Sequence, residues 1–407
     1  MRTILCLADA EKGHAFLRAV KERGFKVILL TREGLRHGDW PWQAIDQLHT
    51  VHDLNVPRHL MDFTLWLARR EKIDVVVGLD EFDTTRAAAI REMLRVPGMS
   101  LTDSLRWRDK LAMREVAHAA GVAVPEFVPF QNEAQIVEFL GRTKGPWLVK
   151  PRMLAGSLNI RKYSTASEVR AAFERLGSEA VDYLLEVFIP GPLYHVDGIV
   201  DGGRVKFVQA HKYGRPLFEV AHGGGVFTSA NVERGSATDT ALKTAHDKVT
   251  AALGMQRGVT HAEFIEGADG KFYFVETAAR VGGAHLSDLI EQTSGLNLWR
   301  EWGILSALAP NEPYTLPATK LTHGGLALCL AKQKKPDYST FPDPEIALRI
   351  EHEHHAGLVV RTTSAARAEE MIRGYVQRFT SEFLATLPVV EKGVGIEGPY
   401  IRQLFMN

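Results

Sequence analysis

The chain has 407 residues, of which 45% are hydrophobic and 24% charged, and this is enough for two or three soluble domains with hydrophobic cores. Its 49 basic residues balance 49 acidic ones, so no overall charge attracts nucleic acid or an anionic membrane, and any anion site must be local. The two cysteines, Cys6 and Cys329, lack metal-ligand spacing, and no apolar run approaches the ~20 residues of a membrane span, so we expect a cytoplasmic protein.

The first segment, residues 1–103, alternates short apolar runs with helical ones. Thr3 to Ala8, Lys26 to Leu30 and Ile73 to Leu79 have the composition of buried strands, and a helix is expected near Lys12 to Arg23. This βαβ order predicts an α/β domain with a parallel sheet. The Gly-x-Gly-x-x-Gly phosphate fingerprint is absent after the first strand, which argues against a dinucleotide dehydrogenase.

A second unit, residues 104–310, begins with a predicted helix from Arg106 to Ala120. From Pro146 the pattern predicts a strand, a glycine-containing loop, a strand, a helix and a further strand that ends before Gly191. Two alternating runs, His195 to Val200 and Arg204 to His211, then indicate an antiparallel sheet. Residues 311–407 contain strand-like and helical runs without a motif for chemistry.

Glu263 and Glu276 lie in two runs, Val259 to Glu266 and Lys271 to Thr277, that predict a β-hairpin. If Gly267 to Gly270 form the loop, Glu263 faces Phe274 and Glu276 is its diagonal neighbour. If only Asp269 and Gly270 turn, the two glutamates are directly opposite. In either register both carboxylates share one face and repel each other unless a cation lies between them or one holds a proton. A hard ion such as Mg²⁺ suits these oxygen ligands and would bring phosphate with it, whereas an edge hairpin with solvated glutamates is the alternative.

Basic residues mark a candidate phosphate site. Lys150 ends a predicted strand before Pro151, and the loop after it contains Gly156 and Ser157 with basic residues at both ends, so its backbone N–H groups and charge can bind phosphate. Lys110, in the predicted helix, is a weaker candidate. Taken separately, each of these features also fits a solvated polar loop or helix face.

Four further features allow a functional interpretation. The backbone of Val187 to Ile189, which follows Glu186, can read the edge of an adenine, although a strand entering a turn fits equally. Arg280 can clamp a carboxylate or an acyl phosphate, or can pair with a nearby acid. His222 precedes a run of glycines in a loop that could cover a substrate. The histidine-rich segment 351–355 resembles a metal tract, but the alternation of a strand favours a solvated face.

In their order along the chain, these motifs resemble the ATP-grasp superfamily, in particular its carboxylate–amine ligases. The resemblance covers roughly Ser104 to Ala309. It implies an N-terminal α/β domain, an ATP-grasp fold of α+β subdomains that hold ATP, with a lid at about residues 121–186, and a C-terminal part, residues 311–407, that completes the core.

The resemblance also implies a role for each matching residue. Lys110 and Lys150 would contact the ATP phosphates, the Gly156-Ser157 loop would fold over them, and Glu186, Val187 and Ile189 would hold the adenine. Glu263 and Glu276 would carry Mg²⁺, or Mn²⁺ in its place, and Arg280 would steady the acyl phosphate. Two positions depart from the family pattern. Ala278 stands where many members have a metal-binding asparagine. Leu193 stands where many members have, shortly after the adenine segment, a glutamate that binds the ribose.

The function implied is that of an ATP-dependent ligase that activates a small carboxylate, plausibly an amino acid, as an acyl phosphate and joins it to an amine. Phosphoryl transfer needs positioning and charge neutralisation more than a nucleophilic side chain, which agrees with these residues. The alternatives are a bicarbonate-activating carboxylase and a nucleotide-binding sensor without turnover, the latter consistent with Ala278. The partners expected are small-molecule substrates, neither nucleic acid nor membrane, and a homodimer is compatible with the resemblance.

Overall fold

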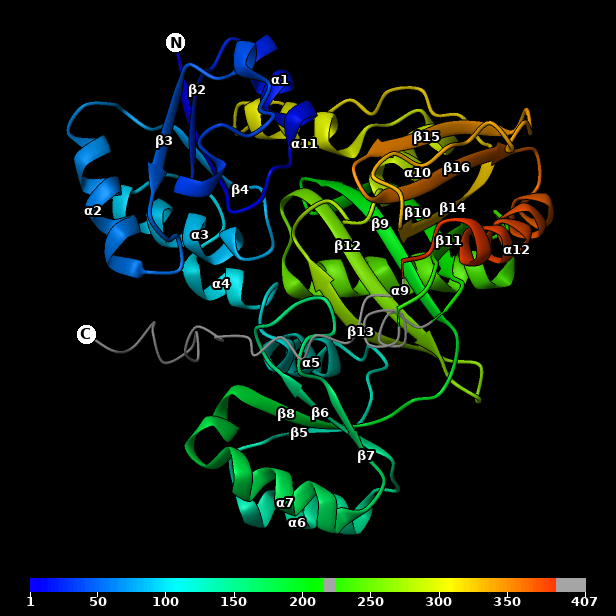
Figure 1. The fold of residues 1–407 in the computed structure, drawn as a ribbon. Coiled ribbons are helices and arrows are strands. Elements are labelled where there is room, and N and C mark those ends of the chain that lie inside the picture. The colour runs from blue at the N-terminus through cyan, green and yellow to red at the C-terminus, as the bar shows by residue number, and fades with distance from the viewer. Residues whose placement is uncertain (216–223, 386–407) are drawn as a thin grey trace.

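The computed structural model describes residues 1–215 and 224–385, which form three β-sheets with flanking helices (Figure 1). The N-terminal sheet and the small sheet of residues 127–187 lie on different sides of a larger, eight-stranded sheet. His222 lies outside the described residues. Within them, no helix has the length and apolar character needed to cross a membrane.

The N-terminal sheet is parallel, as the βαβ pattern predicts. Its strand order is β3-β2-β1-β4, and every residue of the central strand β1 is buried, which is why that strand is almost wholly apolar. The elements are β1 (Thr3–Ala8), α1 (His14–Glu22), β2 (Lys26–Arg32), η1 (Glu33–Leu35), η2 (Trp42–Ala44), β3 (Gln47–Val51), α2 (Pro57–Ala68), β4 (Val75–Gly78) and α3 (Asp83–Leu94).

Two short helices lead out of this domain: α4 (Leu101–Leu105) and α5 (Lys110–Ala119). The helix predicted to begin at Arg106 therefore begins four residues later. The reason is local, because α4 ends first and the side chain of Asp109 then accepts a hydrogen bond from the backbone N–H of Leu111, which caps α5. The cap places Lys110 in the first turn of α5.

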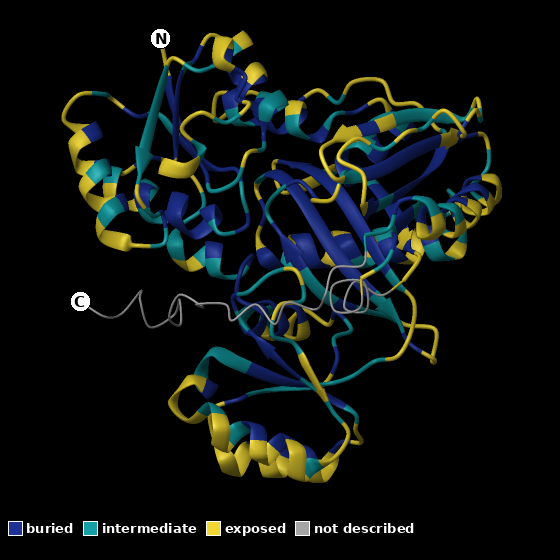
Figure 2. Ribbon diagram, viewed as in Figure 1, coloured by how far each residue is buried: buried dark blue, intermediate teal, exposed yellow. Residues whose placement is uncertain are grey.

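The small sheet is antiparallel, with strand order β5-β8-β6-β7, and helices α6 and α7 cover one face of it (Figure 1). The outer faces of these helices are exposed (Figure 2). The elements are β5 (Phe127–Pro129), α6 (Glu133–Arg142), β6 (Trp147–Pro151), β7 (Arg161–Tyr163), α7 (Ala166–Leu176), η3 (Gly177–Asp182) and β8 (Tyr183–Val187). The predicted order of strand, loop, strand, helix and strand is thus confirmed.

The eight-stranded sheet has the order β13-β12-β9-β10-β11-β14-β16-β15 and is antiparallel throughout. One face packs on α9 and α5 through an apolar cluster that includes Phe264 and Phe274. The elements are β9 (Leu193–Asp201), β10 (Arg204–Tyr213), β11 (Phe227–Asn231), α9 (Ala237–Leu253), β12 (Arg257–Glu266), β13 (Phe272–Ala278), α10 (Leu286–Ser294), α11 (Leu298–Ala307), β14 (His323–Leu330), β15 (Ile346–His352), β16 (His355–Thr362) and α12 (Ala365–Glu382). The last three strands, which come from the motif-free C-terminal part, extend the same sheet.

The N-terminal domain is packed firmly against this sheet through α1 and α11. The ring of Phe16 meets that of Trp302 edge to face, with centroids 5.2 Å apart. Gly303 allows the close approach, since a Cβ atom there would lie 2.7 Å from the carbonyl oxygen of Phe16. A single apolar cluster therefore runs from β1 to α11.

A polar contact reinforces this junction. Glu81 follows β4, and its carboxylate forms ion pairs with Arg280, which follows β13 (2.5 Å, Nη2 to Oε2), and with Arg108, which precedes α5. Burial alone would raise the pKa of Glu81, but the two guanidinium groups outweigh it and lower the pKa from 4.5 to about 2. Glu81 is therefore ionised above pH 5 and connects three segments.

This contact predicts an acid-sensitive contribution to stability. Because the folded-state pKa of Glu81 is depressed, its contribution is present above the unfolded-state pKa and is lost as the pH falls towards 2. We expect the pH-dependent contribution of Glu81 to the free energy of unfolding to decrease from about 3 kcal/mol at pH 5 to about half of that at pH 3. Urea unfolding of the wild type and Glu81→Gln at both pH values measures it. Glu312→Gln, which breaks the solvent-exposed pair with Arg23, is the control and should show a smaller change; an equal change would contradict the assignment.

Candidate functional site

The hairpin of β12 and β13 places Glu263 directly opposite Glu276. This is one of the two predicted registers, but a two-residue turn does not produce it. Near the loop, Phe264 pairs with Phe274, and a β-bulge between this pair and the glutamate pair shifts the register by one residue. The bulge puts Glu276 on the opposite face from Phe274, so the phenylalanines enter the core and the glutamates face the other side of the sheet.

A cation lies beside this acidic pair. The Nζ atom of Lys110 is 2.9 Å from Oε2 of Glu276 and donates to the carbonyl oxygen of Leu154 at 2.6 Å. Burial opposes ionisation of Glu276, but Lys110 outweighs it and keeps the pKa of that carboxyl below its usual value. Glu263 is buried, with 7% of its surface exposed, so an edge hairpin with both glutamates solvated is wrong.

Lys150 and Glu186 form a second ion pair, between adjacent strands β6 and β8. Glu186 is 2% exposed and also binds Arg114 of α5, with Nη2 3.0 Å from Oε2. Burial would raise the pKa of Glu186, but Lys150 and Arg114 lower it. Arg114 thus belongs to the same ion-pair network as two predicted site residues, Lys150 and Glu186. Sequence reasoning missed it.

The predicted adenine segment is already partly engaged. The N–H of Val187 donates to the carbonyl of Glu126, and that of Phe188 donates to the carbonyl of Pro146. Glu186 is also paired, and Ile189 is half-buried beyond the end of β8. The roles of Glu186, Val187 and Ile189 stay predictions.

The Gly156-Ser157 loop connects β6 to β7. Both residues are left-handed, with φ of 68° and 60°, so the chain turns sharply there, and Gly156 is exposed. Lys162, in β7 just after the loop, lies over the ring of Phe188 with Nζ 3.7 Å from its centroid. The loop therefore lies on the same small sheet as Lys150, as a phosphate cover requires.

Arg280 is held rather than free. Its Nε atom donates to Oε2 of Glu81 at 2.6 Å, and Nη1 donates to the carbonyl of Val281 at 2.8 Å. The predicted alternative, pairing with a nearby acid, is therefore what the structure contains. Glu81, which lies far away in the sequence, could not have been recognised as that acid.

A buried polar network beneath Glu263 was also missed. Asp197 accepts hydrogen bonds from Nδ1 of His195 (2.6 Å) and Nδ1 of His261 (2.8 Å), and the Tyr213 hydroxyl donates to Oε1 of Glu263 (2.9 Å). Burial would lower the pKa of His261, but Asp197 raises it to about 10. Alternate polar residues in β9 and β12 were a signal, but which strands would be neighbours was not known.

The side chains of His195, Asp197 and His261 lie close enough to one another to hold a metal ion. Their hydrogen bonds to one another, and that between the Ser229 hydroxyl and Nε2 of His195 (2.7 Å), account for the cluster without one. The other candidate, the histidine tract at 351–355, forms the exposed turn between β15 and β16, where His352 and His355 contact each other. This confirms the solvated face.

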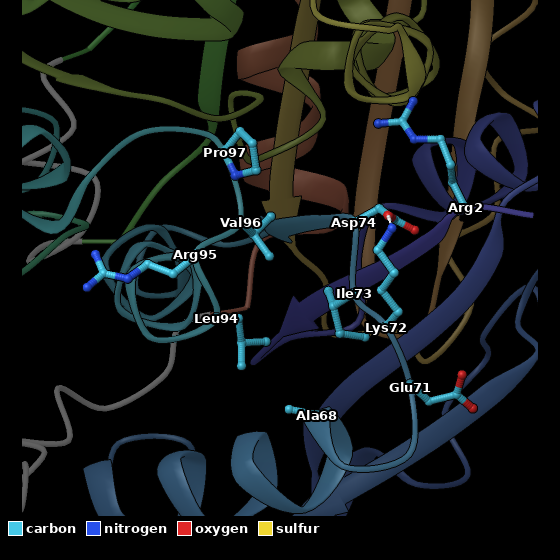
Figure 3. A pocket seen from close by; sticks show the side chains of 10 residues that line it. All are labelled: Arg2, Ala68, Glu71, Lys72, Ile73, Asp74, Leu94, Arg95, Val96 and Pro97. Carbon is cyan, nitrogen blue, oxygen red and sulfur yellow. Dashed lines mark ion pairs between the residues drawn. The ribbon is translucent and has the colours of Figure 1, made fainter.

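A cavity of about 460 Å³ lies elsewhere, at the opposite edge of the N-terminal sheet (Figure 3). Its wall includes Ile73 and Asp74, which precede β4, whereas Glu81 follows that strand. Acidic and basic side chains alternate around it, and Lys72 pairs with Asp74 at 3.3 Å (Figure 3). Ligands of parallel sheets bind at the carboxyl ends of the strands, so the geometry favours the Glu81 edge instead.

Comparison with known sequences finds a family profile and ligases that resemble part of this chain. Residues 143–288 match the family profile described as an ATP-grasp domain. An L-arginine-specific L-amino acid ligase of Bacillus subtilis is 24% identical over 256 residues, which cover 61% of this chain and 60% of that protein. A D-alanine–D-alanine ligase of Pseudomonas fluorescens is 24% identical over 207 residues, 49% of this chain and 62% of that protein. The chain thus spans about three fifths of the length of these relatives.

Solved structures extend the likeness to nearly the whole chain. An L-amino acid ligase from Bacillus licheniformis superposes with a TM-score of 0.74 at 17% identity, covering 95% of this chain and 99% of that one. The N5-carboxyaminoimidazole ribonucleotide synthetase of Thermus thermophilus gives 0.70 at 17% identity, covering 95% and 99%. The chain therefore contains an ATP-grasp domain and has the fold of the ATP-grasp superfamily.

Proposed function

We propose that this protein is an ATP-dependent carboxylate–amine ligase that uses Mg²⁺. The observation that carries the proposal is the direct opposition of Glu263 and Glu276 on one face of the sheet, with Lys110 at their edge. Two acids brought together in a partly buried place suit a divalent ion, and Lys110 and Lys150 suit the phosphates such an ion accompanies.

The residues present fit a hard divalent ion. Within the described residues, Glu263 makes its side-chain contacts through Oε1, so Oε2 is available as a metal ligand. Glu276 supplies the second carboxylate, whereas Ala278 carries no donor atom in its side chain. Glu263 and Glu276 would hold the ion, and Mn²⁺ can replace Mg²⁺ there. The bound ion would neutralise charge on the phosphate oxygens.

The reaction divides into two balanced steps. A carboxylate oxygen of the first substrate attacks the γ-phosphorus of ATP, the bond to the β-phosphate oxygen breaks, and ADP leaves. The amine nitrogen of the second substrate then attacks the carbonyl carbon of the acyl phosphate, which forms the amide and releases phosphate and a proton. Lys110 and Lys150 position the phosphates, and Arg280 at the junction stabilises the acyl phosphate.

Water must be excluded while the acyl phosphate exists, because it hydrolyses. The small sheet, with the Gly156-Ser157 loop, is the lid that does so. Its side-chain ties to α5 and the segment before it include Arg114 with Glu186, Arg152 with Asp109, and Lys110 with the carbonyl of Leu154. Amino acids are the proposed substrates, since the two sequence relatives described above and the Bacillus licheniformis protein are amino-acid ligases.

Turnover measurements test the proposal. With ATP, Mg²⁺ and pools of amino acids, we expect ADP and phosphate to form in equal amounts only when amino acids are present. Dependence on bicarbonate instead would indicate a carboxylase, and tight ATP binding without turnover would indicate a sensor. Either result contradicts the ligase proposal.

Removal of one metal carboxylate should abolish catalysis without unfolding the protein. We expect Glu276→Gln to lower the rate of ADP formation by ~100-fold or more, because it removes an anion that holds the ion and leaves Lys110 unpaired. Glu266→Gln, in the same hairpin beside the loop, is the matched control and should keep the wild-type rate. Near-normal turnover in Glu276→Gln, with an unchanged circular dichroism spectrum, would contradict the metal assignment.

Lys150 should contribute to nucleotide affinity. We expect Lys150→Met, which keeps most of the buried stem but loses the charge, to weaken ATP binding by about tenfold. Isothermal titration calorimetry measures the dissociation constant, and thermal melting checks the fold. Lys144→Met is the control, because Lys144 is exposed and lies in the connection between α6 and β6. An unchanged dissociation constant in Lys150→Met would remove this lysine from the phosphate site.

A further inference from the structure

We propose that Tyr213 is a positioning residue that fixes the Glu263 carboxylate, so that one of its oxygens is always directed towards the metal position. The inference rests on the proposed function, since it concerns how the chain prepares a metal ligand. It adds a residue that neither the motif pattern nor the Glu263–Glu276 pair indicates.

The contacts of Glu263 are one-sided. The hydroxyl of Tyr213 donates to Oε1 at 2.9 Å, and Nε2 of His261 lies 3.7 Å from the same atom. A carboxylate rotates about its last bond unless hydrogen bonds hold it. The hydrogen bond from Tyr213, with the His261 imidazole beside the same oxygen, holds the carboxylate in one orientation and leaves Oε2 for the ion.

Tyr213 reaches Glu263 across a whole strand. It lies on β10, whereas Glu263 lies on β12, and β9 runs between them. His195 of β9 pairs directly with Glu263, and the Tyr213 ring packs on the His195 ring with centroids 4.7 Å apart. The histidine ring is therefore the platform on which the tyrosine rests.

That platform cannot turn. Nδ1 of His195 is bonded to Asp197 at 2.6 Å and Nε2 to Ser229 at 2.7 Å, and all three residues are buried. Asp197 holds His261 as well, through its other oxygen. Asp197 thus fixes both groups beside Oε1 of Glu263, because it holds His261 directly and Tyr213 through the ring of His195. Of these two groups, Tyr213 is the one whose contact can be removed by deleting a single atom.

The hairpin offers a matched control. Tyr194, on β9, donates its hydroxyl to Oε2 of Glu266 at 2.7 Å, and it is as buried as Tyr213, each being 4% exposed. Glu266 is three residues from Glu263 on β12, and the Tyr194 ring belongs to the apolar cluster on the opposite face of the sheet. Tyr194→Phe likewise removes a hydrogen bond from a buried tyrosine to a glutamate, here the half-buried Glu266, without touching Glu263.

Mn²⁺ binding to the full chain in the presence of ADP, followed by electron paramagnetic resonance, tests the inference without turnover. Outer hydrogen bonds to metal ligands typically change metal affinity 10–100-fold, so we expect Tyr213→Phe to weaken Mn²⁺ binding at least about tenfold and Tyr194→Phe to leave it unchanged. In a Glu263→Ala background, Tyr213→Phe should change Mn²⁺ affinity no further, because its effect passes through Glu263.

Each other outcome overturns the inference. Wild-type Mn²⁺ affinity in Tyr213→Phe, or a loss that persists undiminished in the Glu263→Ala background, would show that the tyrosine does not act through this carboxylate. An equal loss in Tyr194→Phe would assign the effect to general packing. Absence of nucleotide-dependent Mn²⁺ binding in the wild type would instead refute the metal site of the proposed function, and the inference with it.

Discussion

A carboxylate that is taken out of water needs a cation, and at this site every cation comes from a different part of the chain than the acid that it compensates. Helix α5 makes two of these contacts at once. Lys110, in its first turn, binds Glu276 of the eight-stranded sheet, and Arg114, one turn later on the same face, binds Glu186 of the small sheet. The helix is therefore the electrostatic link between the eight-stranded sheet, which carries the acidic pair, and the small sheet.

This pairing explains how a site can be charged and still fold without its ligands. Lys110 balances Glu276, and Lys150 with Arg114 balances Glu186, so neither of these two acids is left without a cation. Under the proposed function, negative phosphate oxygens would replace the carboxylates as partners of Lys110 and Lys150. A divalent ion would replace Lys110 as the partner of Glu276. Exchange of partners then keeps the local charge balanced, which lowers the cost of binding.

Local patterns in the sequence were sufficient to predict the strands named below and which residues lie in them. The alternation in β12 and β13 predicted the hairpin, and the apolar runs of β1 and β4 predicted a parallel sheet, because both depend on neighbours in the chain. The bulge after Glu263 was not predictable, since an extra residue in one strand leaves the composition of the run unchanged. Glu81 and Arg114 were missed for another reason, because ordinary charged residues acquire a role only through partners that are distant in sequence.

The bulge also explains why the two faces of the sheet have such different chemistry at its edge. With regular alternation, Phe274 and Glu276 would share one face, and either the phenylalanine would leave the core or the glutamate would enter it without a partner. One unpaired residue removes this conflict, so that Phe274 packs with Phe264 while Glu276 meets Glu263 and Lys110. The acidic pair therefore exists because the ladder is interrupted at that point, and a regular hairpin with the same residues could not form both the core and the site.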